Sequence, residues 1–122
     1  MLTKKDYKIN NKFTGFEKDI TWSADNIVKI ILLTNDNNFE KLNEYANNFI
    51  TDKVNWEKKI ISSLQNELTQ SVEKPISIKD IDTILFQNDE VFEIYFYSNE
   101  STLNNNTLCL IGNINDKILL SN

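Results

Sequence analysis

The side chains in this sequence that could do chemistry are mainly carboxylates, because most of the usual catalytic residues are missing. The chain has no histidine, one cysteine and two glycines. Histidine is the common proton carrier near neutral pH and a common metal ligand, and a thiolate zinc site needs several cysteines. Two separate glycines cannot build a loop that cradles phosphates. Carboxylates, lysines, tyrosines and hydroxyls are what remain.

Asp80 and Asp82 form the best acidic pair, because residues two apart in a strand point to the same face. Two carboxylates on one strand face could hold a hard cation such as Mg²⁺. A pair of solvated turn acids is the alternative, because the pair follows the only proline and the sequence designates no further ligand. We expect the solvated pair, and therefore no metal site and no cofactor.

Two further motifs have structural explanations. Glu57, Lys58 and Lys59 match the Glu-x-Lys fragment of some metal nucleases, which present it from a strand, whereas the pattern here is helical. We expect these three residues on a solvated helix face. Cys109 lies between two leucines without a neighbouring cation, which predicts a small buried residue. The sequence therefore predicts no catalytic residue.

Charge is distributed unevenly along the chain. The formal net charge is −5, all 13 basic residues are lysine, and arginine is absent. This balance repels phosphate backbones, so we expect no nucleic-acid partner. Residues 1–18 carry a net charge of +3, whereas residues 80–100 carry six acids and no lysine. The acidic segment is either an exposed strand edge kept soluble by its charges or an acidic docking surface.

The compartment is predicted from what the chain lacks. A single thiol forms no intramolecular disulfide, and no apolar run of signal-peptide length follows Met1. The most apolar stretch, residues 27–33, is far shorter than the ~20 residues that span a bilayer. We expect a cytoplasmic protein with no membrane association.

The elements that must position these side chains follow from the hydrophobic periodicity. A length of 122 residues predicts one domain, 1–122, with a polar, basic lead-in at 1–12. Period-two patterns predict strands at 16–22 and 27–33, paired as a hairpin, with the second strand covered on both faces. Helical patterns follow at 37–50 and 53–70, and four further strands at 83–86, 91–97, 107–111 and 117–120. This order predicts an α+β fold: a mainly antiparallel sheet of five to six strands with two helices packed on one face.

The same patterns predict the core. The first helix is expected to bury a stripe at Phe39, Leu42, Tyr45, Ala46 and Phe49. The second helix is expected to bury a stripe at Val54, Ile60, Ile61, Leu64 and Leu68. Across the whole chain the residues expected to be mostly buried are Trp22, Ile30, Leu32, Phe39, Leu42, Phe49, Ile61, Leu64, Phe92, Ile94 and Phe96.

Strand 91–97 also predicts a binding surface. If its phenylalanines pack under the helices, Glu93, Tyr95 and Tyr97 point to the opposite face. Tyrosine is enriched at interface hot spots, and carboxylates there complement a cationic partner. The alternative is that another layer covers Tyr95 and Tyr97. The candidate partner-binding residues are Asp80, Asp82, Asp89, Glu90, Glu93, Tyr95, Tyr97 and Glu100.

A resemblance covers residues 13–120. Its features are Phe13-Thr14-Gly15-Phe16 before a strand that ends in Trp22, a strand that ends Leu33-Thr34-Asn35-Asp36, a helix with Phe39, Leu42, Tyr45 and Ala46, Trp56 opening the next helix, and a late strand Phe92 to Tyr97. This succession resembles small bacterial α+β domains found among the immunity proteins encoded beside polymorphic toxins, including contact-dependent growth inhibition systems. Such proteins often carry an aromatic residue followed by Gly-His near the last strands, where this chain has Leu103 to Thr107. No functional residue is carried over.

The resemblance and the acidic segment together suggest an immunity protein, a monomer before binding, that binds and neutralises a cognate basic toxin domain such as a nuclease. One alternative is a carboxylate-dependent metal hydrolase that uses Asp80, Asp82 and Glu93. Another is an accessory or oligomeric interaction domain with no toxin partner.

Overall fold

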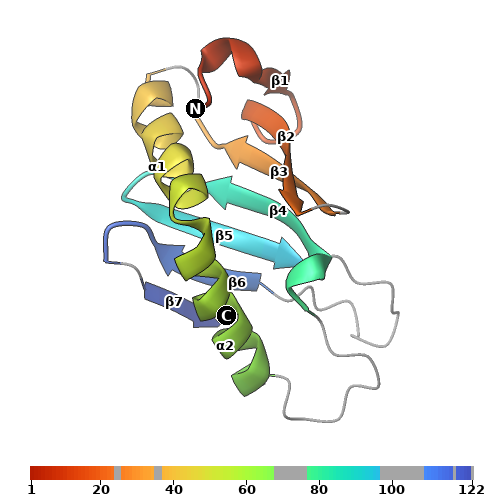
Figure 1. The fold of residues 1–122 in the computed structure, drawn as a ribbon. Helices are drawn as coiled ribbons and strands as arrows, with labels where there is room; N and C mark the ends of the chain where they lie inside the picture. The colour runs from red at the N-terminus through yellow and green to blue at the C-terminus, as the bar shows by residue number, and fades with distance from the viewer. Residues whose placement is uncertain (24–25, 35–36, 68–76, 97–108, 117, 122) are drawn as a thin grey trace.

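The computed structural model describes residues 1–23, 26–34, 37–67, 77–96, 109–116 and 118–121. Its seven strands form one sheet, and both α-helices lie across the same face of that sheet (Figure 1). The elements in chain order are η1 (Lys4–Asp6), β1 (Lys8–Asn10), β2 (Gly15–Ser23), β3 (Asn26–Leu32), α1 (Phe39–Thr51), α2 (Lys53–Glu67), η2 (Ile78–Asp80), β4 (Ile81–Phe86), β5 (Val91–Phe96), β6 (Cys109–Asn113) and β7 (Ile118–Ser121).

The strands lie in the sheet in sequence order, and one neighbouring pair is parallel. β3 and β4 run parallel, whereas the other five pairs are antiparallel. A parallel pair needs a crossover connection, and the two helices lie in the chain between β3 and β4. The predicted α+β class, the β2–β3 hairpin and the two helices on one face are confirmed. The sheet has seven strands because part of the lead-in, β1, pairs with β2.

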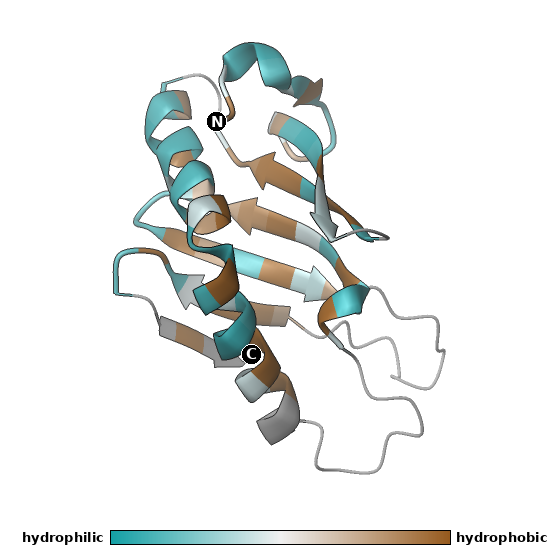
Figure 2. Ribbon diagram, viewed as in Figure 1, coloured by the Kyte–Doolittle hydropathy of each residue, from teal (hydrophilic) through white to brown (hydrophobic). Residues whose placement is uncertain are grey.

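The helix-covered face of the sheet holds the core. The first helix buries the predicted stripe of Phe39, Leu42, Tyr45, Ala46 and Phe49, and Figure 2 shows hydrophilic residues along its outward side. Of the residues expected to be mostly buried across the whole chain, all except Ile61 are confirmed: Trp22, Ile30, Leu32, Phe39, Leu42, Phe49, Leu64, Phe92, Ile94 and Phe96 are at most 4% exposed.

The predicted stripe of α2 is wrong at two positions. Val54 is 67% exposed and Ile61 is 41% exposed. The buried residues are Trp56, Ile60 and Leu64, at a spacing of four that keeps them on one side of the helix. Val54 precedes Trp56 by two positions and so points away from the sheet. Leu68, the last predicted member, lies outside the described residues.

β3 is central in the sheet but is not covered on both faces. Ile27 is 63% exposed, because the helices cover the other face. Ile31 lies four residues further along the strand, on the same face as Ile27, and is nevertheless only 2% exposed. The prediction of a fully covered strand is therefore wrong at Ile27.

The N-terminal segment is fastened to α1. Asn43 and Asn47 each donate a side-chain hydrogen bond to the carbonyl oxygen of Leu2, at 2.9 and 3.0 Å. Leu2 returns its N–H to Asn47 Oδ1 at 2.9 Å, and the Tyr7 hydroxyl donates to Asn43 Oδ1 at 2.8 Å. The polar lead-in is thus part of the folded structure. No helix in the described ranges is long and apolar enough to cross a membrane.

Candidate functional site

The face of the sheet that points away from the helices carries the candidate site, and we call it the open face. Cross-strand partners share a face, so the register of β2 to β6 identifies its members. They include Glu17, Asp19, Lys29, Ile31, Thr83, Leu85, Glu93, Tyr95, Cys109 and Ile111. The open face combines carboxylates, a tyrosine and an apolar strip.

A hollow of about 770 Å³ lies on the open face, beside the β1–β2 loop, and we call it the open-face hollow. Its floor is formed by Ile31 and Leu85, which are direct partners across the parallel β3–β4 pair. Its complete lining is Asn10, Asn11, Lys12, Phe13, Glu17, Lys29, Ile31, Asp82, Thr83, Leu85, Tyr95 and Phe96. Pockets that hold small ligands have volumes of roughly 300 to 1,000 Å³, so the hollow is large enough for a side chain of a partner.

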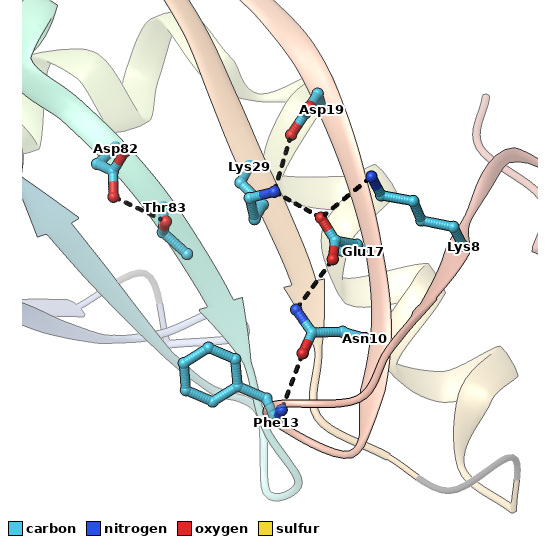
Figure 3. A network of polar contacts seen from close by, with 8 residues as sticks. All are labelled: Lys8, Asn10, Phe13, Glu17, Asp19, Lys29, Asp82 and Thr83. Carbon is cyan, nitrogen blue, oxygen red and sulfur yellow. Dashed lines mark hydrogen bonds and ion pairs between the residues drawn. The ribbon is translucent and has the colours of Figure 1, made fainter.

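A charge network borders the hollow on the β2 and β3 side (Figure 3). Lys29 Nζ lies 2.5 Å from Glu17 Oε2 and 3.5 Å from Asp19 Oδ1, and Lys8 Nζ lies 3.9 Å from Glu17 Oε2. The hydrogen bond from Lys29 lowers the pKa of Glu17, against the opposing effect of burial. The same bond raises the pKa of Lys29. Four charged groups therefore neutralise one another on this part of the open face.

The network also positions the β1–β2 loop. Asn10 Nδ2 donates to Glu17 Oε1 at 3.1 Å, and the backbone N–H of Phe13 donates to Asn10 Oδ1 at 2.8 Å. Figure 3 shows this path from Lys29 through Glu17 and Asn10 to Phe13. The two hydrogen bonds of Asn10 are of normal length and hold Phe13 at the edge of the hollow. Phe13 is 41% exposed there.

Glu93 and Tyr95 lie on the open face, as the strand alternation predicts, and both are half-buried. Gln87 Nε2 and the Tyr95 hydroxyl donate to the two carboxylate oxygens of Glu93, and Cys109 Sγ lies 3.8 Å from one of them. Burial and the hydrogen bond to Glu93 raise the pKa of Tyr95. Burial likewise raises the pKa of Cys109, which is 7% exposed. Glu93 therefore binds groups of its own chain, and the ring of Tyr95 is fixed by its hydroxyl.

The two acids of the best predicted pair do not share a strand face. Asp80 belongs to η2, where its carboxylate accepts the N–H of Ser77 at 2.8 Å. Asp82 occupies a bulge of β4, since the register passes from Ile81 to Thr83, and it is exposed. The Thr83 hydroxyl donates to Asp82 Oδ2 at 3.1 Å. The prediction of two carboxylates on one strand face is wrong, because a short helix and a bulge interrupt the alternation.

The other predicted site residues are spread out. Asp89 and Glu90 lie in the β4–β5 turn, with φ angles of 65° and 69°. That turn is at the opposite end of β4 from Asp80 and Asp82. Tyr97 and Glu100 lie outside the described residues. Within the described ranges no three cysteine or carboxylate side chains are grouped so as to hold a metal ion.

The sequence patterns single out Asp82 and Tyr95 but not Phe13, Ile31 and Leu85, which complete the hollow. Phe13 belongs to a turn, and Ile31 and Leu85 belong to runs that are apolar at nearly every position. A usable signal was Lys29, a charge inside such a run, which marks the face that the helices leave open.

Searches for matching protein families, curated proteins and solved structures found no match.

The Glu17–Lys29 pair predicts a pH-dependent stability. Because the pKa of Glu17 is lowered in the folded state, its stabilisation is present at neutral pH. It is lost as the pH falls below the ordinary value of 4.5 and through the lower folded-state pKa. Glu17→Gln should cost about 1 kcal/mol at pH 7, measured by urea unfolding, and less at pH 3. Asp19→Asn, whose side chain is 53% exposed, is the control and should cost less at pH 7. An equal cost for Glu17→Gln at both pH values would contradict the assignment.

Proposed function

We propose that this chain is an immunity protein that binds and neutralises a basic toxin domain through the open face of its sheet. In this role the chain acts by binding and carries out no catalytic step. The nature of the partner comes from the sequence resemblance and from the net charge of −5. The observation that carries the proposal is the open face itself, which the helices leave uncovered and on which Asp82 and Tyr95 border one hollow.

Physical arguments support binding at this face. An uncovered sheet face with aromatic rings and apolar floor residues has side chains that are typical of protein interfaces. Its carboxylates would complement a cationic partner. The net charge of −5 would attract a basic partner and raise the association rate at low salt. Tyr95 is pre-positioned by its bond to Glu93, so little conformational entropy is lost when a partner covers its ring.

Co-expression tests the proposal directly. The product of the reading frame adjacent to this chain's gene is expressed alone and together with the chain, and colony formation and co-purification are measured. We expect cells to survive only when the chain is present, and the two proteins to purify together. Survival without the chain, or death in its presence, would overturn the proposed function. Self-association of the chain in place of complex formation would favour the accessory-domain alternative.

Binding kinetics with the same partner should separate two kinds of residue. Tyr95→Ala should accelerate dissociation by a factor of about 30, equivalent to about 2 kcal/mol for an anchor residue. Asp89→Lys changes an exposed charge in the β4–β5 turn and should mainly slow association and weaken its salt dependence. Surface plasmon resonance at two salt concentrations measures both rates.

Thermal unfolding of each free variant provides the control for these kinetics. Asp89→Lys should leave the midpoint nearly unchanged. Tyr95→Phe, which keeps the ring and removes the bond to Glu93, separates the loss of a contact from the loss of ring positioning. If dissociation is unchanged in both Tyr95 variants, the interface does not include this ring.

A further inference from the structure

We infer that the open-face hollow is an anchor site for an arginine side chain of the partner. This inference rests on the proposed function for the basic character of the partner, and it adds which group of that partner binds and where. The hollow has an apolar floor, two aromatic rings at its border and an exposed carboxylate. Arginine matches these three features, because it has an aliphatic stem and a planar cation that stacks on rings and pairs with carboxylates.

The floor suits the stem of such a side chain. Ile31 is 2% exposed and Leu85 is 6% exposed, so both lie at the bottom of the hollow instead of projecting from it. Methylene groups placed over them would leave water at little cost in polar desolvation. The length and flexibility of an arginine side chain allow its head to reach the border while the stem covers the floor.

The two rings lie at the border of the hollow and are held by different parts of the chain. Phe13 is fixed through Asn10 and Glu17, and Tyr95 is fixed through its hydroxyl bond to Glu93. Both aromatic residues line the hollow. A guanidinium group between them would gain cation–π attraction that increases as water is excluded.

Charge within the hollow favours a cation at Asp82. Glu17, Asp19, Lys8 and Lys29 offset one another, as their distances show. Asp82 accepts a hydrogen bond from Thr83 and makes no ion pair with the described residues. Its exposed carboxylate can therefore accept the two parallel hydrogen bonds that a guanidinium donates.

Lys12 is a positive charge beside the hollow, so it would oppose the binding of a second cation there. Its Nζ lies 5.6 Å from the centroid of the Phe13 ring, so a lysine of this chain already lies over one face of that ring. It is exposed and lies on a loop, so it can move away when a partner binds. Removal of this charge should therefore strengthen the binding of a cation, whereas removal of Asp82 should weaken it.

The test uses the intact chain and a peptide probe, acetyl-Gly-Arg-Gly-amide, followed by ¹⁵N–¹H NMR. We expect saturable shifts in the amides around Phe13, Ile31, Thr83 and Tyr95. Asp82→Asn should raise the dissociation constant about tenfold, as expected for the loss of a charge-assisted pair, and Lys12→Gln should lower it. Asp116→Asn is the matched control, an exposed acid outside the hollow, and should change nothing.

Two further peptides define the outcomes that overturn the inference. The citrulline peptide has the same shape without the charge and should not bind. Equal binding of citrulline, equal binding of a lysine peptide, or equal effects of Asp82→Asn and Asp116→Asn would each overturn the arginine site. Shifts spread over all acidic residues would show general charge attraction and would also overturn it.

Co-expression then distinguishes failure of this inference from failure of the proposed function. If the wild-type chain protects cells and Asp82→Asn with Phe13→Ala protects equally well, the proposed function stands and the anchor lies elsewhere. If the wild-type chain gives no protection, the proposed function fails whatever the titration shows. Both substituted residues are exposed, so circular dichroism should show an unchanged fold.

Discussion

Phe49→Ala should destabilise the protein by about 4 kcal/mol, because it removes a fully buried ring that contacts four other aromatic rings. Phe49 is fully buried on α1. Its ring centroid lies 5.8 Å from that of Trp22, 5.2 Å from Trp56, 5.8 Å from Phe86 and 5.1 Å from Phe92. Removing the ring leaves a cavity. It also removes the contacts of α1 with Trp56 on α2 and with rings on β2, β4 and β5. For a chain of this length the melting temperature should fall by roughly 15 °C.

Two comparisons test the reason for this loss. Phe49→Leu keeps most of the apolar volume and should cost far less than Phe49→Ala. Val54→Ala removes an apolar side chain from the exposed side of α2 and should stay within about 0.5 kcal/mol of wild type in urea unfolding. A cost for Phe49→Ala below that of Val54→Ala would show that the aromatic cluster does not join the helices to the sheet.

Gly112→Ala should destabilise the protein by about 3 kcal/mol, because β6 lies against an aromatic ring at this position. Gly112 is the direct cross-strand partner of Phe92, and the added Cβ would lie only 2.2 Å from Cζ of the Phe92 ring. That ring cannot move aside, because it is fully buried and lies 5.1 Å from Trp56 and 5.8 Å from Phe86, measured between ring centroids. The melting temperature should fall by roughly 10 °C.

A double-mutant cycle identifies the cause. In a Phe92→Leu background the end of the ring is gone, so Gly112→Ala should cost clearly less than it does in wild type. Gly15→Ala is the control, because its Cβ would lie 2.2 Å from the backbone carbonyl oxygen of Leu32 and Phe92→Leu does not relieve that clash. An undiminished cost of Gly112→Ala in the Phe92→Leu background would refute the proposed contact.

These core residues support the open face indirectly. β5 carries Phe92, Ile94 and Phe96 into the core and Glu93 and Tyr95 onto the open face. A strand held by three buried side chains gives the alternate residues defined positions. The stability of the aromatic cluster and the geometry of the candidate binding face are therefore linked through one strand.

Local sequence patterns were sufficient where a single period determines the outcome. The alternation in β5 correctly separates its core residues from Glu93 and Tyr95, and the stripe of α1 is correct at every position. These predictions succeed because the side-chain direction depends only on the backbone period of the element itself. The α+β class follows for the same reason, since it requires only the order of helices and strands.

Patterns of the same kind failed where neighbouring elements decide which side chains are covered. Ile60 and Ile61 are equally apolar, and only the position of α2 on the sheet buries the first and exposes the second. Asp80 and Asp82 have the spacing of a shared strand face, yet η2 and the β4 bulge separate them. Such breaks depend on pairing with another strand, which a local pattern does not contain.

The sequence by itself determined the element types, the order of helices and strands, the acidic balance and most of the core. Only the tertiary structure decided that Glu17 is 9% exposed beside Lys29, that Asn43 and Asn47 hold the N-terminal segment, and that Phe13 meets Asp82 and Tyr95 around one hollow. Each of these depends on contacts between residues far apart in the chain. Hydrogen bonds and hollows of this kind arise from strand register and loop placement, so they exist only once the sheet has formed.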